Sequence, residues 1–131
     1  MKISETGSAP AAIGPYSQAI EANGFIYTSG QIPIDPATGA IAGNDITEQT
    51  ERIIQNLSAV LSAARSDLAH VVKTTCFQTD ISHFAAFNAV YERYFTGKPA
   101  RSCVEVSALP KGALAEIELV AVPCKESDPH A

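Results

Sequence analysis

The stretch RSCVEVSALPKGALAEIELVAV, residues 101–122, decides the fold class. It contains two runs rich in β-branched and aliphatic residues, 101–106 and 115–122, on either side of a segment with proline and glycine. Such runs are typical of strands, in which side chains alternate between two faces. One face of each run is more apolar than the other, so we expect two strands of a sheet that is covered on one side.

Two upstream segments predict the helices that would cover this sheet. In residues 45–64 apolar side chains recur at helical spacing, and Asp45 offers a carboxylate as N-cap. Residues 82–95 repeat the pattern with an aromatic face, and Ser82 is the expected cap. Two amphipathic helices are enough to cover one face of a small sheet.

Three further runs predict strands. The runs 17–22 and 25–29 flank Asn23 and Gly24, a dipeptide that favours a type I′ hairpin because both turn positions need a positive φ. The run VVKTTCFQT at 71–79 is rich in β-branched residues.

These elements follow in the order ββαβαββ, which predicts one α+β domain with a single mixed sheet and two helices on one face. The 131 residues are enough for one core and too few for two, so we expect a single domain over 1–131. Its ends, about 1–7 and 124–131, are expected to be loose.

Composition and charge argue against several classes of function. The chain has 9 Lys and Arg against 14 Asp and Glu, a net charge of −5, with no basic cluster, so we expect no nucleic-acid partner. No apolar run approaches the ~18 residues of a membrane span. The first residues lack the pattern of a secretory signal. We therefore expect a cytoplasmic protein with no membrane partner.

The cysteines and histidines predict neither a disulfide framework nor a metal site. The three cysteines include no C-x-x-C pair, and the three histidines are scattered without ligand spacing. These residues are Cys76, Cys103, Cys124, His70, His83 and His130. We interpret them as reduced thiols and surface histidines, with no bound metal.

The less apolar face of the sheet is where we expect a site. Alternation would place Arg101 and Cys103 from one strand and Glu116 from the other on this face, among valines. A mixed face of this kind is rarely left to water. We therefore expect subunits to pack on it, so that a site there would lie at a subunit interface.

Familiar catalytic signatures are absent from the chain. It has no glycine-rich phosphate loop, no G-x-S-x-G, no H-E-x-x-H and no zinc-deaminase pattern. Polar residues in apolar settings remain as candidates: Tyr16, Ser29, Gly30, Gln31, Asn88, Arg101, Cys103 and Glu116.

Five ordered motifs resemble a known family. They are IGPYSQA at 13–19, TSGQIP at 28–33, NAVY at 88–91, PARSCV at 99–104, and LPK at 109–111 followed by EIE at 116–118. Together they span about 10–122, and the chain resembles the RidA/YjgF family. The resemblance implies a chorismate-mutase-like fold, with a six-stranded sheet and two helices on one face. It also implies a homotrimer with active sites in the clefts between subunits.

The resemblance also implies an activity. RidA proteins hydrolyse reactive enamine and imine intermediates, such as 2-iminobutanoate and 2-iminopropanoate, to 2-oxo acids and ammonia without a cofactor. Matched residue by residue, Arg101 looks like the ligand of the substrate carboxylate, and Glu116 like the residue that handles the attacking water. The pocket wall would include Gly30, Cys103, Tyr16, Asn88 and Ser29.

Elementary chemistry agrees with these roles. A guanidinium is a planar fork that holds a carboxylate through two parallel hydrogen bonds, which fixes the orientation of the substrate. A glutamate with an ordinary pKa of ~4.3 is ionised at neutral pH and accepts a proton from water. The same group could then protonate the departing nitrogen. A glycine at position 30 lets backbone N–H groups approach a substrate oxygen.

Structural roles are the alternatives for each residue. Arg101 and Glu116 could pair across neighbouring strands, and Ser29 could satisfy a turn. Cys103 could be a small buried thiol, Tyr16 an aromatic plug and Asn88 a partner of the backbone.

Other functions also stay open. One is a non-catalytic, regulatory or chaperone-like trimer that binds small carboxylates. Another is a pathway-specific deaminase of a larger enamine acid such as 2-aminomuconate, because the connection 96–98 is shorter than usual in RidA-like chains. A ribonuclease activity fits the acidic charge least.

Overall fold

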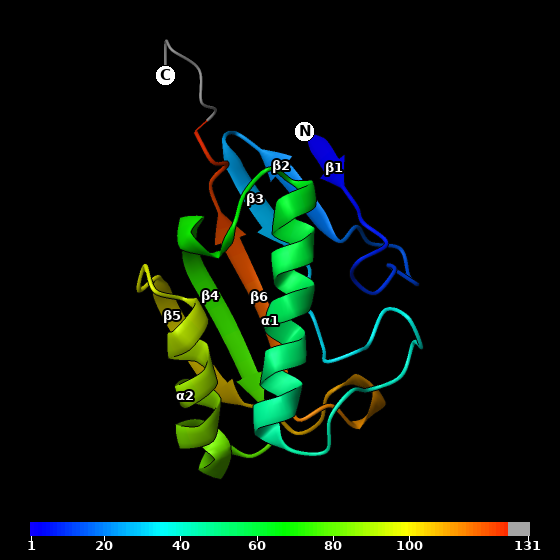
Figure 1. The fold of residues 1–131 in the computed structure, drawn as a ribbon, viewed down its shortest axis with the longest axis vertical. Coiled ribbons are helices and arrows are strands. Elements are labelled where there is room, and N and C mark those ends of the chain that lie inside the picture. Colours follow the sequence, from blue (N-terminus) through cyan, green and yellow to red (C-terminus); the bar gives the residue numbers. More distant parts are fainter. Residues whose placement is uncertain (126–131) are drawn as a thin grey trace.

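The chain folds as a mixed six-stranded sheet with two helices on one face, in a computed structural model that describes residues 1–125 (Figure 1). The strands are β1 (Lys2–Ser4), β2 (Ala19–Ala22), β3 (Phe25–Thr28), β4 (Val71–Gln78), β5 (Ala100–Glu105) and β6 (Ala115–Ala121). They lie in the order β1-β2-β3-β6-β4-β5, and β4 and β5 run parallel. The predicted fold class is therefore confirmed.

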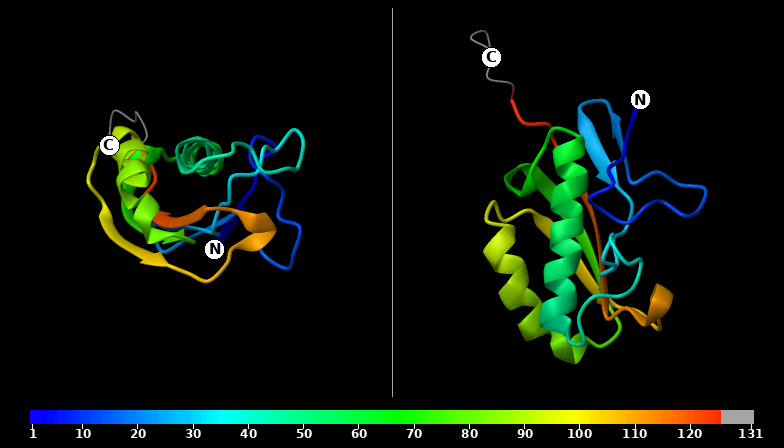
Figure 2. Two further views of the ribbon diagram at one scale, coloured as in Figure 1. Left: turned by 90° about the horizontal axis from the view of Figure 1, so that it is seen from below. Right: turned by 45° about the vertical axis from the view of Figure 1, so that its right-hand side comes forward.

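Helices α1 (Ile46–Ala63) and α2 (Phe84–Tyr94) lie side by side on the same side of the sheet (Figure 2, left). Three short 3₁₀ turns complete the described elements: η1 (Leu68–His70), η2 (Ile81–His83) and η3 (Pro110–Gly112). In this part of the chain, no helix has both the length and the apolar composition needed to cross a membrane.

The start of α1 and the first hairpin form as the sequence predicts. The carboxylate of Asp45 accepts a hydrogen bond from the N–H of Glu48 at 2.8 Å and caps α1. The apolar stripe of α1, which includes Leu57, is buried in the core. Asn23 and Gly24 have φ values of 53° and 80°, as a type I′ turn between β2 and β3 requires.

The expected cap of the second helix is wrong. Ser82 caps nothing; instead the carboxylate of Asp80 accepts a hydrogen bond from the Ser82 N–H at 2.9 Å and begins η2. The helix α2 follows directly from this turn, and its N-cap residue His83 makes no side-chain cap bond. Asp80 is the better cap because its short carboxylate reaches the N–H groups of the tighter turn.

Residues 2–4 and Cys124, which lie in the ends expected to be loose, make regular backbone hydrogen bonds. Residues 2–4 form β1, which pairs antiparallel with β2 and satisfies backbone groups that would otherwise lie on an open edge. At the other end, the N–H of Cys124 donates to the carbonyl of Arg65 at 3.0 Å. Both segments are too short to show a strand period in the sequence. The rest of the expected loose end, 126–131, lies outside the described residues.

The register of β5 corrects the expected faces of the sheet. Arg101 lies beside Thr74 of β4, and Cys103 lies beside Cys76; both β4 side chains are buried under the helices. Arg101 and Cys103 therefore lie on the helical face and not on the open face. Val104, expected to face the core, is 44% exposed. The alternation predicted for β6 is confirmed, with Ile117 and Leu119 buried.

Candidate functional site

Arg101 lies beneath α2, with its guanidinium over aromatic rings. Its Nη1 donates to Oδ1 of Asn88 at 2.8 Å, and its Cζ lies 4.6 Å from the centroid of the Tyr91 ring and 5.4 Å from that of Phe84. These rings stabilise the cation without neutralising it. Among residues 1–125 no carboxylate pairs with this arginine, so most of its N–H donors remain available for an anion.

The guanidinium borders a hollow at the sheet edge. The hollow has a volume of about 460 Å³, and its wall includes Arg101, Asn88 and the connection after α2, with Thr96, Lys98 and Pro99. The unusually short connection therefore lies beside the expected carboxylate ligand. A change in its length would alter the space beside Arg101.

Cys103 lies on β5 two residues after Arg101, on the same face of the sheet. Its sulfur accepts a hydrogen bond from Nε2 of Gln78 at 3.2 Å. Gln78 is fully buried, and its Oε1 has no partner within the described part of the chain. Cys103 is thus held by a core amide, and no histidine bonds to its sulfur in residues 1–125.

Glu116 lies on β6 and projects from the open face of the sheet. Its carboxylate is packed against Gly30: a Cβ at position 30 would lie 2.2 Å from Oε2 of Glu116. The glycine is needed here for close approach. Glu116 is half-buried, and no hydrogen bond or ion pair reaches its carboxylate from residues 1–125.

Burial raises the pKa of the Glu116 carboxyl above its ordinary value, and the like charge of Glu118 on the same face raises the pKa further. A carboxylate with a raised pKa is a stronger base than an ordinary glutamate. This change suits a group that must take a proton from water near neutral pH.

A small pocket of about 220 Å³ surrounds Glu116. Its wall contains Gly30, Tyr16 and a set of aliphatic and turn residues: Pro10, Ala11, Ile13, Gln18, Gln31, Ile32, Ile34, Pro110 and Lys111. The lining is mostly apolar, with one carboxylate. Such a pocket fits a short aliphatic chain near a group that handles protons.

Ser29 and Tyr16 have clear local roles. The hydroxyl of Ser29 donates to the carbonyl of Ser17 at 2.6 Å, which supports the interpretation that Ser29 satisfies a turn. The ring of Tyr16 packs over Gly14, where an added Cβ would lie 3.1 Å from the ring. Tyr16 is nevertheless half-exposed and lines the pocket of Glu116.

Within one copy of the chain, the predicted site residues form two separate groups. Arg101, Asn88 and Cys103 lie on the helical side of the sheet, whereas Glu116 and Gly30 lie on the open side. The strand β4 separates β5 from β6, and the side chains of Arg101 and Glu116 point to opposite faces of the sheet. The expectation that Arg101 and Glu116 share one face is wrong. An ion pair between neighbouring strands is also excluded within one copy.

The contacts between Arg101 and the residues of α2 were not predicted from the sequence. Phe84, Asn88 and Tyr91 recur at helical spacing, so all three project from one face of α2. That spacing was visible in the sequence. The sequence did not show which strand this face of α2 covers.

A mixed six-stranded sheet with two helices on one face is the architecture of the chorismate-mutase-like proteins. The profile of the Endoribonuclease L-PSP family matches residues 6–123. The chain therefore belongs to this family, which is also called the RidA/YjgF family.

Three known proteins illustrate the similarity. The 2-iminobutanoate/2-iminopropanoate deaminase of Salmonella typhimurium is 48% identical over 121 residues, which cover 89% of this chain and 94% of that protein. The crystal structure of the YjgF gene product of E. coli has a TM-score of 0.88 and 44% identity, and covers 93% of this chain and 98% of that one. The crystal structure of E. coli TdcF with bound serine has a TM-score of 0.89 and 41% identity, covering 95% of this chain and all of that one.

Proposed function

We propose that this protein is a hydrolytic deaminase of small 2-imino acids, such as 2-iminobutanoate and 2-iminopropanoate. The observation that carries this proposal is the pair of unneutralised charges, a cation over aromatic rings at Arg101 and a half-buried carboxylate against Gly30 at Glu116. A related protein is named as such a deaminase, and TdcF holds serine, a small amino acid with a carboxylate.

The site is completed between two copies of the chain. Arg101 and Glu116 lie on opposite faces of one copy, so a substrate that touches both must lie where the Arg101 side of one copy meets the Glu116 side of another. The open face supports such packing, because Tyr27 and Val104 are 48% and 44% exposed on it. Opposite unpaired charges on the two sides make the contact complementary. We propose a homotrimer with one site in each cleft.

The reaction needs positioning and proton transfer. Arg101 holds the substrate carboxylate, and Glu116 takes a proton from a water molecule whose oxygen attacks the C=N carbon. A C–O bond forms and the electron pair of the C=N π bond moves to nitrogen. Glu116 then delivers its proton to that nitrogen, which gives a carbinolamine. Glu116 next takes the proton of the new hydroxyl group and passes it to the amino nitrogen; as the C=O π bond forms, the C–N bond breaks with its electron pair, and the products are a 2-oxo acid and ammonia. The imine and water supply every atom, so no cofactor is required.

A trapping assay tests this function directly. A pyridoxal-phosphate-dependent dehydratase generates 2-iminobutanoate, and semicarbazide competes for it. We expect the protein to suppress the semicarbazide adduct and to speed release of 2-oxobutanoate in proportion to its concentration. An unchanged adduct yield at all protein concentrations would contradict the proposal.

The pH dependence of kcat follows from the environment of Glu116. This group must be deprotonated to act as base, and burial and Glu118 raise its pKa, so kcat should fall as the pH decreases through that raised pKa. Glu118→Gln removes the like charge, lowers the pKa of Glu116 and should shift the acid limb to lower pH. The measurement is kcat against pH with one substrate for both proteins. Glu48→Gln, on α1 at the other side of the sheet, is the control. If the acid limb of the kcat profile moves to higher pH in Glu118→Gln, or moves equally in the control, Glu116 is not the base that titrates.

Gly30→Ala should lower kcat at least about tenfold, because its Cβ would displace the Glu116 carboxylate from its position. Gly30 does not have a positive φ, so alanine fits the backbone and the free energy of unfolding should change by less than about 1 kcal/mol. Gly7→Ala is the matched control, because nothing lies within 4 Å of its added Cβ. Steady-state kinetics and urea unfolding check both values; wild-type kcat in Gly30→Ala would count against the role of the close contact.

A further inference from the structure

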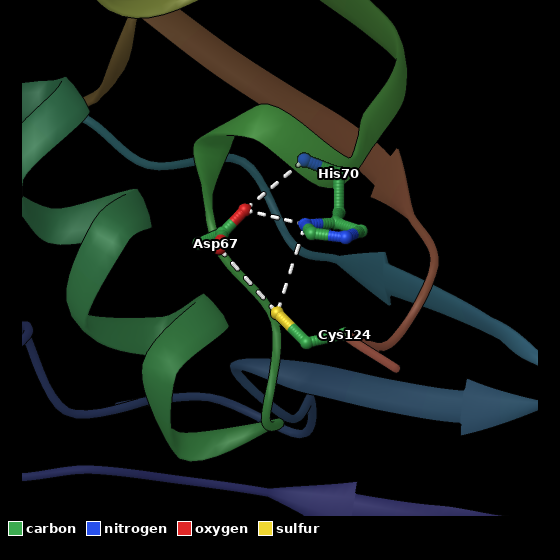
Figure 3. A group of neighbouring side chains, drawn as sticks. All are labelled: Asp67, His70 and Cys124. Carbon is green, nitrogen blue, oxygen red and sulfur yellow. Dashed lines mark hydrogen bonds and ion pairs between the residues drawn. The ribbon is translucent and has the colours of Figure 1, made fainter. Parts of the chain in front are cut away.

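A cluster of three potential metal ligands lies apart from both groups of predicted site residues, the one with Arg101 and the one with Glu116. Asp67 begins η1, His70 ends it, and Cys124 follows β6 (Figure 3). Oδ1 of Asp67 lies 2.6 Å from Nδ1 of His70, and the Cys124 thiol donates to Oδ2 of Asp67 at 3.4 Å. The sulfur lies 3.6 Å from the same His70 nitrogen. Three different ligand types therefore converge on one point at the surface.

Backbone hydrogen bonds hold the two segments of the cluster together. The N–H of Cys124 donates to the carbonyl of Arg65 at 3.0 Å, and the N–H of Val122 donates to the carbonyl of His70 at 3.0 Å. The hydroxyl of Ser66 donates to the carbonyl of Val122 at 2.6 Å. The ligands are thus positioned by the fold and not only by their own contacts, which lowers the cost of ordering them around an ion.

The spacing of the ligand atoms suits a tetrahedral metal ion. With typical Zn–N, Zn–O and Zn–S bonds of about 2.0–2.3 Å, the edges of the tetrahedron are about 3.3–3.8 Å. The Nδ1–Sγ distance of 3.6 Å and the Sγ–Oδ2 distance of 3.4 Å match these edges. Oδ2 is therefore the oxygen that would bind the metal, because Oδ1 lies only 2.6 Å from Nδ1, in a hydrogen bond that a metal on Nδ1 would replace.

The chemistry of the ligands selects the ion. A thiolate, an imidazole and a carboxylate together are typical of zinc, which is of intermediate softness, and they do not suit magnesium or calcium. A thiolate and a carboxylate also offset the charge of a divalent cation. We propose that Asp67, His70 and Cys124 form a Zn²⁺ site that keeps a fourth position open to water. The sequence did not suggest it because 54 residues separate His70 from Cys124.

Cobalt titration of the reduced, metal-free chain tests this site independently of any deaminase activity. Co²⁺ is the probe, because a bound thiolate gives a charge-transfer band and tetrahedral geometry intensifies the visible bands. We expect one equivalent of Co²⁺ to produce both, Zn²⁺ to displace it, and Zn²⁺ to raise the thermal midpoint.

Variants separate this site from adventitious binding. Cys124→Ser should remove the charge-transfer band, and His70→Ala should weaken Co²⁺ binding at least about tenfold. His83→Ala is the matched control: His83 and Asp80 have the same sequence spacing at 3.8 Å but belong to no such cluster within residues 1–125. Cys103→Ser controls for the other partly exposed thiol. Asp67→Asn keeps the cap of η1 and removes one ligand charge, so it should weaken binding in a folded chain.

The wild-type protein and the variants give clear contrary outcomes. The proposal fails if stoichiometric Co²⁺ gives no charge-transfer band. It fails equally if the band persists in Cys124→Ser, or if His83→Ala reduces binding as much as His70→Ala does. None of these outcomes bears on the trapping assay, so the zinc site and the deaminase proposal stand or fall separately.

Discussion

Replacing Arg101 with alanine should lower kcat/KM for 2-iminobutanoate at least about 100-fold. A charge-assisted hydrogen bond contributes about 1.5–3 kcal/mol, and the Arg101 guanidinium that this variant removes would make two such bonds to the substrate carboxylate. Since each 1.36 kcal/mol corresponds to about a tenfold change in rate, the prediction is a minimum. Arg101→Lys keeps the charge but loses the fork, so it should recover only part of the activity. Steady-state kinetics on the imine generated in situ measures both variants.

Arg93→Ala is the control for this experiment. Arg93 is also on α2 but is exposed and pairs with Glu51 on the outer surface, so kcat/KM should stay within about twofold of wild type. Urea unfolding of Arg101→Ala separates loss of binding from loss of the stack on Tyr91, which contributes about 1 kcal/mol. Equal kinetics for Arg101→Ala and wild type would remove the carboxylate anchor from the account.

Glu116→Gln should lower kcat about 10²–10⁴-fold, because glutamine keeps the shape of the side chain and cannot accept the proton from water. The Kd for 2-oxobutanoate, measured by calorimetry, should change by less than about threefold, since the anchor for the carboxylate is elsewhere. Glu118→Gln is the matched control, and its maximal kcat should stay within about twofold of wild type.

This pair of measurements also separates an enzyme from a binding protein. A regulatory protein that only holds small carboxylates would show no turnover in the wild type, and Glu116→Gln would leave its ligand affinity unchanged. In an enzyme, Glu116→Gln would abolish most of the turnover and leave the affinity for the ligand nearly unchanged. Retention of wild-type kcat in Glu116→Gln would exclude this residue as the water-handling group.

Local patterns predicted most of the fold. The stripe of α1, the Asp45 cap and the Asn23–Gly24 turn depend on neighbours in the chain, and all three form as expected. The strand β1 was missed because three residues are too few to show a period of two. Asp80 replaced Ser82 as the cap because the chain begins α2 through a 3₁₀ turn, which lacks the helical spacing.

The relation between the two key residues could not be predicted from the sequence. Alternation placed Glu116 correctly, since β6 has one clearly apolar face. For β5 the more apolar face, which includes Val104, is not the buried one, because α2 covers the other face and its Tyr91 ring accepts the guanidinium of Arg101 there. Which strand lies between β5 and β6 is a property of sheet order, which no local pattern encodes.

We propose that each site takes its cation from one copy of the chain and its carboxylate from another. Subunit mixing tests it most directly: Arg101→Ala and Glu116→Gln chains are unfolded together in equal amounts, refolded and assayed for imine hydrolysis. If subunits mix at random, each half of a cleft is intact in one case of two, so about one quarter of the clefts are complete. We predict about a quarter of wild-type activity from two nearly inactive parents. A mixture no more active than its parents, with subunit exchange verified by mass, would contradict the claim.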